Sequence, residues 1–277
     1  MNPSADQAQP LTPELRAWMA EQTAQGHSME QILQAIVTAG WSPDVAAAAL
    51  QPGDDRLPAL KVPALLPLQS GNMVDAGDKW VQVTYYIEQP ELAVFGNLLS
   101  DGECDAIIAS ARQRLSRSLT VDTHTGGEEL HPDRTSEGMF FDRGETEVIQ
   151  RVEARIARLI GWPVKNGESL QVLRYPPGAE YKAHYDYFDP GASGTAAILK
   201  RGGQRVATLI MYLHEPDGGG ATVFPVLGIT VEPKRGTAVF FSYSRPHPCS
   251  LTLHGGEPVT AGEKWIATKW LREKEFV

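Results

Sequence analysis

Residues 180–187 read Glu-Tyr-Lys-Ala-His-Tyr-Asp-Tyr, a stretch that contains two side chains able to bind a metal ion. Tyr181 and Tyr185 stand among polar residues, an alternation that predicts a β-strand, in which side chains two residues apart point to the same face. His184 and Asp186 are therefore expected to project side by side, so that an imidazole nitrogen and a carboxylate oxygen can occupy adjacent positions on one metal ion. A surface strand can also carry such a pair without any ligand. The pair therefore needs support from the rest of the sequence.

The composition is that of a globular protein and excludes several classes. Of 277 residues, 42% are apolar and 21% are charged, which excludes an intrinsically disordered composition. No apolar run approaches the roughly 20 residues of a membrane span, and the N-terminus has no signal-peptide pattern. The net charge of −9 argues against nucleic acid as a partner. Two cysteines, Cys104 and Cys249, form no disulfide framework and fit a reducing cytoplasm. We expect a cytoplasmic protein that binds neither nucleic acid nor a membrane.

Residues 1–54 are expected to form a separate acidic module of three short helices, in a pattern that resembles a ubiquitin-associated-type bundle. The predicted helix starts are Thr12-Pro13, the capping box of Ser28 and Gln31, and Ser42-Pro43. The segment carries six acidic side chains and one basic one, a net charge of −5. The module is either a solvated bundle or a docking module for a partner or substrate.

A proline-rich stretch, residues 55–78, is expected to link this module to a larger domain of residues 79–277. In the larger domain, Ser100 and Glu103 form a capping box that opens one helix, and a second helix is expected from about Glu147 until Gly161-Trp162-Pro163 stops it. Between the two helices, residues 120–138 are polar and without periodicity, a length typical of active-site lids.

From about residue 168 the periodicity changes from helical to two. The strand candidates, separated by Gly and Pro turns, are Trp80–Ile87 ahead of the helices and then Ser169–Tyr175, Tyr181–Tyr187, Arg205–Leu213, Gly236–Tyr243, His247–His254 and Lys264–Leu271. Helices followed by many short strands predict an α+β fold in which helices back a sandwich or a jelly-roll barrel. The core is expected at about residues 168–273.

A metal site built on His184 and Asp186 needs at least one further ligand, and four histidines compete for that role: His131, His214, His247 and His254. The first lies in the expected lid. The second precedes a Glu-Pro-Asp-Gly turn and is expected at the surface, and the third is flanked by prolines. The fourth ends a predicted strand before Gly255-Gly256. The positions of these histidines in the sequence do not decide which of them is the third metal ligand.

A resemblance to a known family supplies the choice. The series Tyr175, His184-x-Asp186, His254 and Lys264, with Gly-Glu-Lys-Trp at 262–265, resembles the prolyl 4-hydroxylase-type branch of the iron(II)/2-oxoglutarate dioxygenases. The likeness runs from about Leu92 to Phe276 and includes Arg134-Thr135-Ser136, Leu170-Gln-Val-Leu-Arg-Tyr175 and Gly219-Gly-Ala-Thr-Val-Phe-Pro225. The likeness is specific because the metal ligands, the lysine and the framework residues all occur, and they occur in the family's order along the chain.

This resemblance implies a double-stranded β-helix (jelly-roll) core and an iron(II) site of His184, Asp186 and His254, the two-histidine, one-carboxylate triad that leaves three metal positions open. It implies that 2-oxoglutarate and O2 fill the open positions, with ascorbate as a further cofactor. Lys264 would provide the counter-charge for the far carboxylate of 2-oxoglutarate. Tyr175 and Thr222 match positions that hydrogen-bond the cosubstrate, and Tyr181, Arg205 and Trp270 match positions on the peptide side.

The implied reaction is hydroxylation of a prolyl residue in a protein or peptide, with release of succinate and CO2. Two segments depart from the family pattern, residues 242–248 before the distal histidine and an insertion-like stretch at 189–194. Both flank the expected substrate entrance, so the substrate stays open. The alternatives are a hydroxylase of free proline or another small molecule, a zinc hydrolase that uses the same three ligands, and a non-catalytic binding protein.

Overall fold

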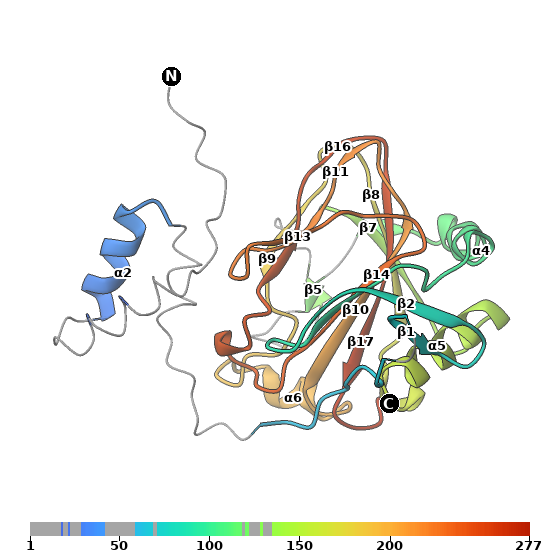
Figure 1. Ribbon diagram of the computed structural model, residues 1–277, viewed down its shortest axis with the longest axis horizontal. Helices are drawn as coiled ribbons and strands as arrows, with labels where there is room; N and C mark the ends of the chain where they lie inside the picture. Colours follow the sequence, from blue (N-terminus) through green and yellow to red (C-terminus); the bar gives the residue numbers. More distant parts are fainter. Residues whose placement is uncertain are drawn as a thin grey trace.

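A large antiparallel sheet runs through the centre of the molecule (Figure 1). The computed structural model describes residues 18, 22, 29–41, 59–68, 71–117, 120–121, 128–129 and 135–277. Within these residues the sheet has nine strands. In spatial order they are β1 (Met73–Asp75), β2 (Trp80–Ile87), β3 (Leu92–Phe95), β14 (Ala238–Ser242), β10 (Arg205–His214), β17 (Lys264–Arg272), β8 (Leu170–Tyr175), β7 (Glu137–Phe141) and β4 (Ser116–Arg117).

A smaller sheet faces the large one and completes the double-stranded β-helix. It contains, in spatial order, β13 (Ile229–Val231), β12 (Thr222–Phe224), β15 (His254–Gly256) and β9 (Tyr181–His184). Two further pairs are β11 (Gly218–Gly219) with β16 (Val259–Ala261), and β5 (Thr120–Val121) with β6 (Glu128–Glu129). The expectation of an α+β jelly-roll core backed by helices is therefore confirmed.

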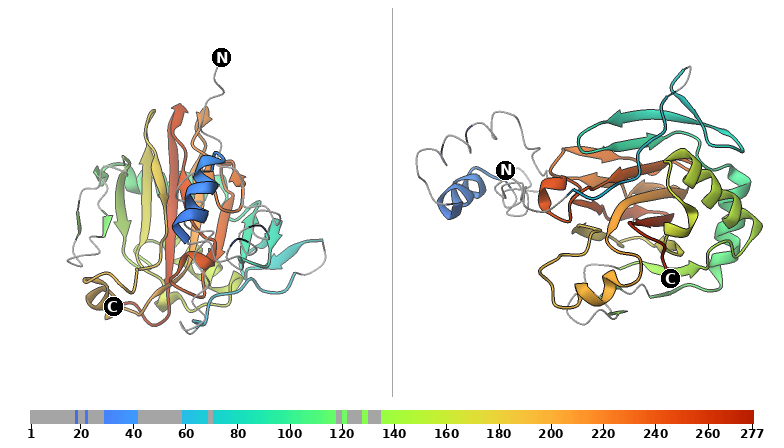
Figure 2. Two further views of the ribbon diagram at one scale, coloured as in Figure 1. Left: turned by 90° about the vertical axis from the view of Figure 1, so that its left-hand side faces the viewer. Right: turned by 90° about the horizontal axis from the view of Figure 1, so that it is seen from below.

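Two helices cover the other face of the large sheet, α4 (Asp101–Arg112) and α5 (Glu147–Leu159), as Figures 1 and 2 show. The predicted capping box opens α4, since the Ser100 hydroxyl accepts from the Glu103 amide and the Glu103 carboxylate accepts from the Ser100 amide. Thr146 caps α5 through the Ile149 amide. The other helices with described bounds are α2 (Met29–Thr38), α6 (Thr195–Leu199), and the short 3-10 turns η1 (Val164–Asn166) and η2 (Pro248–Ser250).

The two faces of the large sheet bury two different cores. Side chains from the helix-covered face pack with α4 and α5, and those from the other face pack against the smaller sheet. Strand β17 shows the division clearly, because all nine of its residues are buried while alternate side chains point to opposite faces. Trp265 and Ala267 join the helix side, and Ile266 joins the side of the smaller sheet. Because β17 is buried on both faces, its polar residues are buried as well, among them Lys264, Lys269 and Arg272.

Several expected strands have the expected extent. Trp80–Ile87 is β2, and the predictions for β10 and β17 each differ from the observed strand by one residue at the C-terminal end. The strand expected at His247–His254 is wrong. Pro246 and Pro248 cannot donate to a ladder, the His247 ring caps the turn η2, and Leu251 adopts a left-handed φ of 58°. Only His254, where β15 begins, belongs to a strand.

The proline-rich segment contacts the larger domain along its described part. The amides of Ala64 and Leu66 donate to the carbonyls of Ile160 and Leu159 at the end of α5, and the side chain of Leu60 packs against the helix-side core. Strand β1 also lies within the segment expected as a linker and pairs with β2.

Of the expected N-terminal bundle, α2 is described. The first expected helix is described at Trp18, which is helical, and the third expected helix lies outside the described residues. Gly40 follows α2 with a φ of 98°, as expected of a residue that ends a helix. Among the described helices, none combines the length and the apolar character that a membrane crossing requires.

Candidate active site

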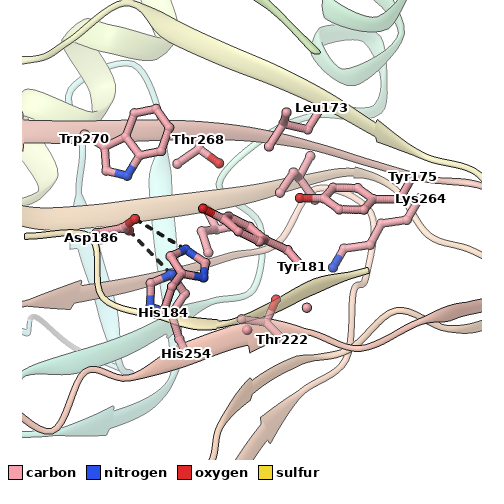
Figure 3. A pocket seen from close by; sticks show the side chains of 14 residues that line it. Leu173, Tyr175, Tyr181, His184, Asp186, Thr222, His254, Lys264, Thr268 and Trp270 are labelled. Atoms are coloured by element: carbon pink, nitrogen blue, oxygen red, sulfur yellow. Dashed lines mark ion pairs between the residues drawn. The ribbon is translucent and has the colours of Figure 1, made fainter. Parts of the chain in front are cut away.

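A pocket opens between the two sheets, and β17 provides one of its walls (Figure 3). Lys264, Ile266, Thr268 and Trp270 all point into it, because residues two apart on a strand share a face. The pocket encloses about 430 Å³ of empty space, including its open mouth. Its other lining residues are Leu173, Tyr175, Tyr181, His184, Asp186, Ile210, Thr222, His254, Gly255 and Gly256. The predicted metal ligands and the predicted lysine therefore line one cavity.

Two histidines meet at the metal end because their strands pair directly. His184, the last residue of β9, is the register partner of His254, the first residue of β15. Their ring centroids are 4.5 Å apart. Among the described histidines, the structure thus places His254 beside His184. The ring of His214 is exposed and contacts the Glu263 carbonyl, and His131 lies outside the described residues.

Asp186 joins the two histidines from outside the strand. Its Oδ1 lies 3.6 Å from His184 Nε2, and its Oδ2 lies 3.5 Å from His254 Nε2. The prediction that Tyr181–Tyr187 is one strand is wrong, because β9 ends at His184. After that residue, side chains hold the chain in place of strand pairing: Gln204, just before β10, and Thr208, within β10. Gln204 accepts from the Phe188 amide and donates to the Phe188 carbonyl, both at 2.7 Å.

The hydrogen bonds of the two imidazoles leave a lone pair of each ring facing the cluster. His184 Nδ1 contacts the Lys182 carbonyl at 2.8 Å, and His254 Nδ1 contacts the Thr252 carbonyl at 3.0 Å. A carbonyl only accepts, so each Nδ1 carries the proton and each Nε2 is free to bind a metal. All three ligand atoms lie within 4.8 Å of one another.

Electrostatics keep Asp186 and His254 in the protonation states that a metal requires. Burial lowers the pKa of His254 to about 4, with Asp186 partly opposing the shift, so this ring is neutral at pH 7. Burial alone would raise the pKa of Asp186, but the two histidines and Arg205 outweigh it and hold that pKa well below its usual range. Imidazole nitrogens and one carboxylate oxygen suit a non-haem iron(II) ion with open positions. The residues present therefore fit the iron that the sequence implies.

The opposite end of the pocket holds a buried cation. Lys264 is 3% exposed, and its Nζ donates to the Gly220 carbonyl at 2.5 Å. The structure records no ion pair between Lys264 and a described residue, while the rings of Tyr175 and Tyr212 lie 5.5 and 5.7 Å from its Nζ. Burial lowers the pKa of Lys264 to about 8, so the amine is still mostly charged at pH 7. A desolvated ammonium of this kind has a strong preference for an anionic ligand.

The backbone around this lysine leaves space for its side chain. Gly220 has a φ of 75°, and a Cβ at this position would lie 3.2 Å from the Cδ of Lys264. Lys264 is the register partner of Tyr175 on β8, and Thr222 is the register partner of Gly256 on β15. The three residues expected to bind the cosubstrate thus line one end of the pocket. The hydroxyl of Tyr212 also donates to Thr222 Oγ1 at 2.8 Å.

The three residues expected on the substrate side occupy two different environments. Tyr181 stacks on His184 with ring centroids 3.8 Å apart, and Trp270 lines the pocket. Arg205 is not among the lining residues. Its guanidinium binds both oxygens of Glu168, at 2.7 and 2.9 Å, and lies 4.0 Å from the centroid of the Trp270 ring. Arg205 therefore supports the wall of the pocket from behind.

Sequence reasoning missed three side chains that hold Asp186 and the segment after it. They are Gln204, Thr208 and Tyr243, of which Thr208 donates to Asp186 Oδ2 at 2.6 Å. The available signal was a threonine within the apolar stretch Arg205–Leu213, where a buried hydroxyl requires a partner. Of the motif Arg134-Thr135-Ser136, Arg134 lies outside the described residues. Thr135 exchanges hydrogen bonds with the backbone of Glu180.

Comparisons with known proteins agree with this geometry. Residues 170–272 match the family model of the 2OG-Fe(II) oxygenase superfamily. Prolyl 4-hydroxylase 5 of Arabidopsis thaliana is 39% identical over 229 residues, which cover 75% of this chain and 76% of the relative. Prolyl 4-hydroxylase 1 of the same plant is 42% identical over 206 residues, or 67% of this chain and 70% of the relative.

A solved structure shows the same fold. The viral collagen prolyl hydroxylase of Paramecium Bursaria Chlorella virus-1, in complex with 2OG, superposes with a TM-score of 0.52 at 35% identity. The superposition covers 65% of this chain and 95% of the viral chain. Matched family model, extensive identity and shared fold lead to one conclusion: this chain is an iron(II)/2-oxoglutarate-dependent dioxygenase and belongs to the family that contains the prolyl 4-hydroxylases.

Proposed function

We propose that this enzyme hydroxylates a prolyl residue in a protein or peptide, with consumption of 2-oxoglutarate and O2 and release of succinate and CO2. The observation that carries the proposal is a single pocket with a His-Asp-His cluster at one end and a buried ammonium at the other. The relatives named prolyl 4-hydroxylase support the choice of a prolyl substrate.

The proposed roles follow the two ends of the pocket. His184, Asp186 and His254 hold iron(II), with each imidazole binding through Nε2. The iron, when bound, supplies the activation of O2 that lets an unreactive C–H bond be hydroxylated. Two neutral imidazoles and one carboxylate leave a net charge of +1 on the site, which favours the binding of anionic 2-oxoglutarate.

The residues at the other end select and orient the cosubstrate. We propose that the Lys264 ammonium pairs with the far carboxylate of 2-oxoglutarate, and that Tyr175 and Thr222 hydrogen-bond the same molecule. Leu173, Ile210 and Ile266 line the pocket with these residues and exclude water from its walls. Exclusion of water strengthens the charge pair, because the local dielectric is low. The His-Asp-His cluster and Lys264, at opposite ends of the pocket, would thereby orient a dicarboxylate.

The substrate side is assigned to the mouth of the pocket. Tyr181, next to His184, and Trp270 offer aromatic surface to a prolyl ring. Arg205, expected in the same group, contributes through the Trp270 ring that it supports. The expected lid, residues 120–138, lies outside the described residues except for β5, β6, residues 135–136 and the start of β7.

The test is a turnover assay with iron(II), 2-oxoglutarate, ascorbate and O2. Succinate formation is measured with proline-rich peptides and with free proline, and mass spectrometry locates the added oxygen. Peptide-dependent succinate with hydroxyproline as product supports the proposal, whereas turnover with free proline alone contradicts the peptide substrate. The His254→Ala protein is the inactive control. Tight binding of zinc alone, with hydrolysis and without O2 uptake, would show a zinc hydrolase.

Two further assignments belong to the same proposal. The acidic module of residues 1–54 is proposed to dock the protein substrate, and deletion of this module should then raise the KM for a protein substrate and leave the KM for a short peptide unchanged. A cytoplasmic location, without nucleic acid or membrane as a partner, is proposed from the net charge of −9 and from the free thiols of Cys104 and Cys249. Fractionation of the producing cells tests the location.

A further inference from the structure

The carboxylate of Asp186 faces the two histidines with both of its oxygens. Oδ1 lies 3.6 Å from His184 Nε2, and Oδ2 lies 3.5 Å from His254 Nε2 (Figure 3). A metal held between these groups could bind either oxygen or both. The difference matters chemically, because a carboxylate bound through both oxygens takes a coordination position that the cosubstrate or O2 requires. Some feature of the protein therefore has to choose one oxygen.

One side chain approaches one oxygen only. Thr208, in the middle of β10, is fully buried, and its hydroxyl lies 2.6 Å from Asp186 Oδ2. A carboxylate accepts and does not donate, so the single hydroxyl proton of Thr208 is committed to Oδ2. Hydrogen bonds to a charged acceptor are short and strong. Oδ2 is therefore occupied from the side of the large sheet, and no described hydroxyl group approaches Oδ1 in the same way.

A second hydroxyl fixes the direction of the first. Tyr243 Oη lies 3.0 Å from Thr208 Oγ1. Because the Thr208 proton points to Asp186, Tyr243 must be the donor in this second contact. Tyr243 is 1% exposed, and burial raises the pKa of its phenol well above the usual value, so the proton is retained. The result is a one-way series of hydrogen bonds from Tyr243 to Thr208 and from Thr208 to Asp186.

Asp186 depends on this series because β9 has already ended. The strand pairing that aligns His184 with His254 does not extend to it. Apart from the two histidines and Thr208, the described contact of this residue is a long one, from Arg205 Nη1 to the Asp186 carbonyl at 3.4 Å. This backbone contact leaves the side chain free to rotate. The orientation of the carboxylate about its own axis is therefore set by Thr208.

We propose that Thr208, with Tyr243 behind it, is a positioning residue that restricts Asp186 to binding the metal through one oxygen, Oδ1. This inference rests on the proposed role of Asp186 as a metal ligand. The hydroxyl of Thr208 keeps Oδ2 turned toward β10 and so preserves an open position on the metal. Tyr243 acts only through Thr208, since it keeps the threonine proton directed at the carboxylate.

Four variants and a matched control test the proposal on the complete chain. Thr208→Val removes the hydroxyl at constant shape, and Thr208→Ser keeps the hydroxyl but removes the methyl group. Tyr243→Phe and the Thr208→Val/Tyr243→Phe double variant complete the set. Thr237→Val is the control, because it also removes a threonine hydroxyl, which donates to the Lys234 carbonyl at 2.6 Å in an exposed turn.

The measurements do not depend on catalysis. Calorimetry gives the Kd for Mn(II) and Co(II) without 2-oxoglutarate, and the visible spectrum of the Co(II)-loaded protein reports the coordination number. Thermal unfolding of the metal-free proteins shows which variants are folded. If Thr208→Val does not fold, Thr208→Ser and Tyr243→Phe still decide the outcome.

We expect Thr208→Val to weaken metal binding about 10- to 100-fold and to shift the Co(II) spectrum toward higher coordination. Tyr243→Phe should weaken it less, by about fivefold, the value of one neutral hydrogen bond. The double variant should match Thr208→Val alone, because Tyr243 has no independent effect. Thr208→Ser and Thr237→Val should bind as wild type does.

Three results would overturn the inference: wild-type affinity and spectrum in Thr208→Val, a Thr208→Ser protein as weak as Thr208→Val, or additive losses in the double variant. If the wild-type protein itself fails to bind Mn(II) or Co(II), the metal assignment of the proposed function fails, and this inference fails with it. Binding by wild type and equal binding by Thr208→Val would instead reject the role of Thr208 alone.

Discussion

The two ends of the pocket are built in different ways. The end with Lys264 comes from a nine-residue strand, β17, whose neighbours β8 and β10 fix every residue through backbone pairing. The end with Asp186 comes from a segment just beyond the four-residue strand β9. The side chains of Gln204, just before β10, and of Thr208, within β10, hold this segment in place. Strand-borne residues inherit their position from the sheet. Asp186 has its position only as long as a few specific hydrogen bonds persist.

The largest expected effect is at the end held by side chains. Replacement of Asp186 by Ala should abolish iron-dependent turnover, by about a thousandfold or more, because the metal loses its anionic ligand and several kcal/mol of binding. Succinate formation at saturating 2-oxoglutarate measures this loss. Circular dichroism should show an unchanged fold, since β9 does not include this residue. Turnover within tenfold of wild type would remove Asp186 from the ligand set.

At the strand-borne end, Lys264→Ala should raise the apparent KM for 2-oxoglutarate by about a hundredfold, because loss of one partner of a buried charge pair costs about 2–5 kcal/mol. The metal ligands are untouched, so the Kd for Mn(II) should stay at its wild-type value. The matched control is Lys234→Ala, which removes the same charge from an exposed turn. An unchanged KM in Lys264→Ala would contradict the assignment of this lysine to the cosubstrate.

The pH dependence separates the two ends further. Burial lowers the pKa of Lys264 to about 8, so the KM for 2-oxoglutarate should be constant below pH 8 and rise about tenfold per unit above it. The unfolded chain keeps this proton to about pH 10.5, so between the two values the unfolded state binds more protons. The contribution of this group to the free energy of unfolding therefore increases with pH over that range, while cosubstrate affinity falls. The Lys264→Ala protein should show no such rise of KM, and an equal rise in that variant would refute the explanation.

The smallest effects are expected from substitutions of one supporting residue at each end of the pocket, Gln204 near Asp186 and Ile266 near Lys264. Gln204→Met removes both hydrogen bonds to Phe188 and should lower turnover several-fold, with a loss of about 1–3 kcal/mol in the free energy of unfolding. Ile266→Val, in the pocket-facing row of β17, should cost a similar 0.5–1.5 kcal/mol and leave turnover nearly unchanged. Kinetics and chemical denaturation of both proteins measure the contrast. Equal kinetic losses would mean that both ends are positioned in the same way.

The same difference explains what the sequence could predict. Strands β2, β10 and β17 follow from their own residues, because alternation and burial are local properties that appear as periodicity. The expected convergence of His184, Asp186, His254 and Lys264 in one pocket is observed as well, although the resemblance to a family, and not the periodicity, selected His254 among the competing histidines.

The two errors in the strand predictions have different physical causes: the contacts after His184 are distant in the sequence, whereas the prolines and the His247 cap before His254 are local. The segment after His184 and the segment before His254 are each held by side chains, Gln204 and Thr208 in the first case and the His247 cap in the second. The partners of the first segment lie 16 and 22 residues away in the chain. No local pattern records such contacts, and for the same reason Arg205 was expected in the pocket although its charge is committed to Glu168.

The alternation of β17 also has a consequence for redesign. Residues 264, 266, 268 and 270 form one row of side chains that faces the pocket, and the row between them faces the core under α4 and α5. A mutant library confined to the pocket-facing row changes which oxoacid and which substrate ring can enter, while the helix-facing row preserves the packing that keeps the strand in place. One short stretch of gene thus contains four sites for altering selectivity. They are alternate residues of one strand, and the residues between them pack against the helix-side core.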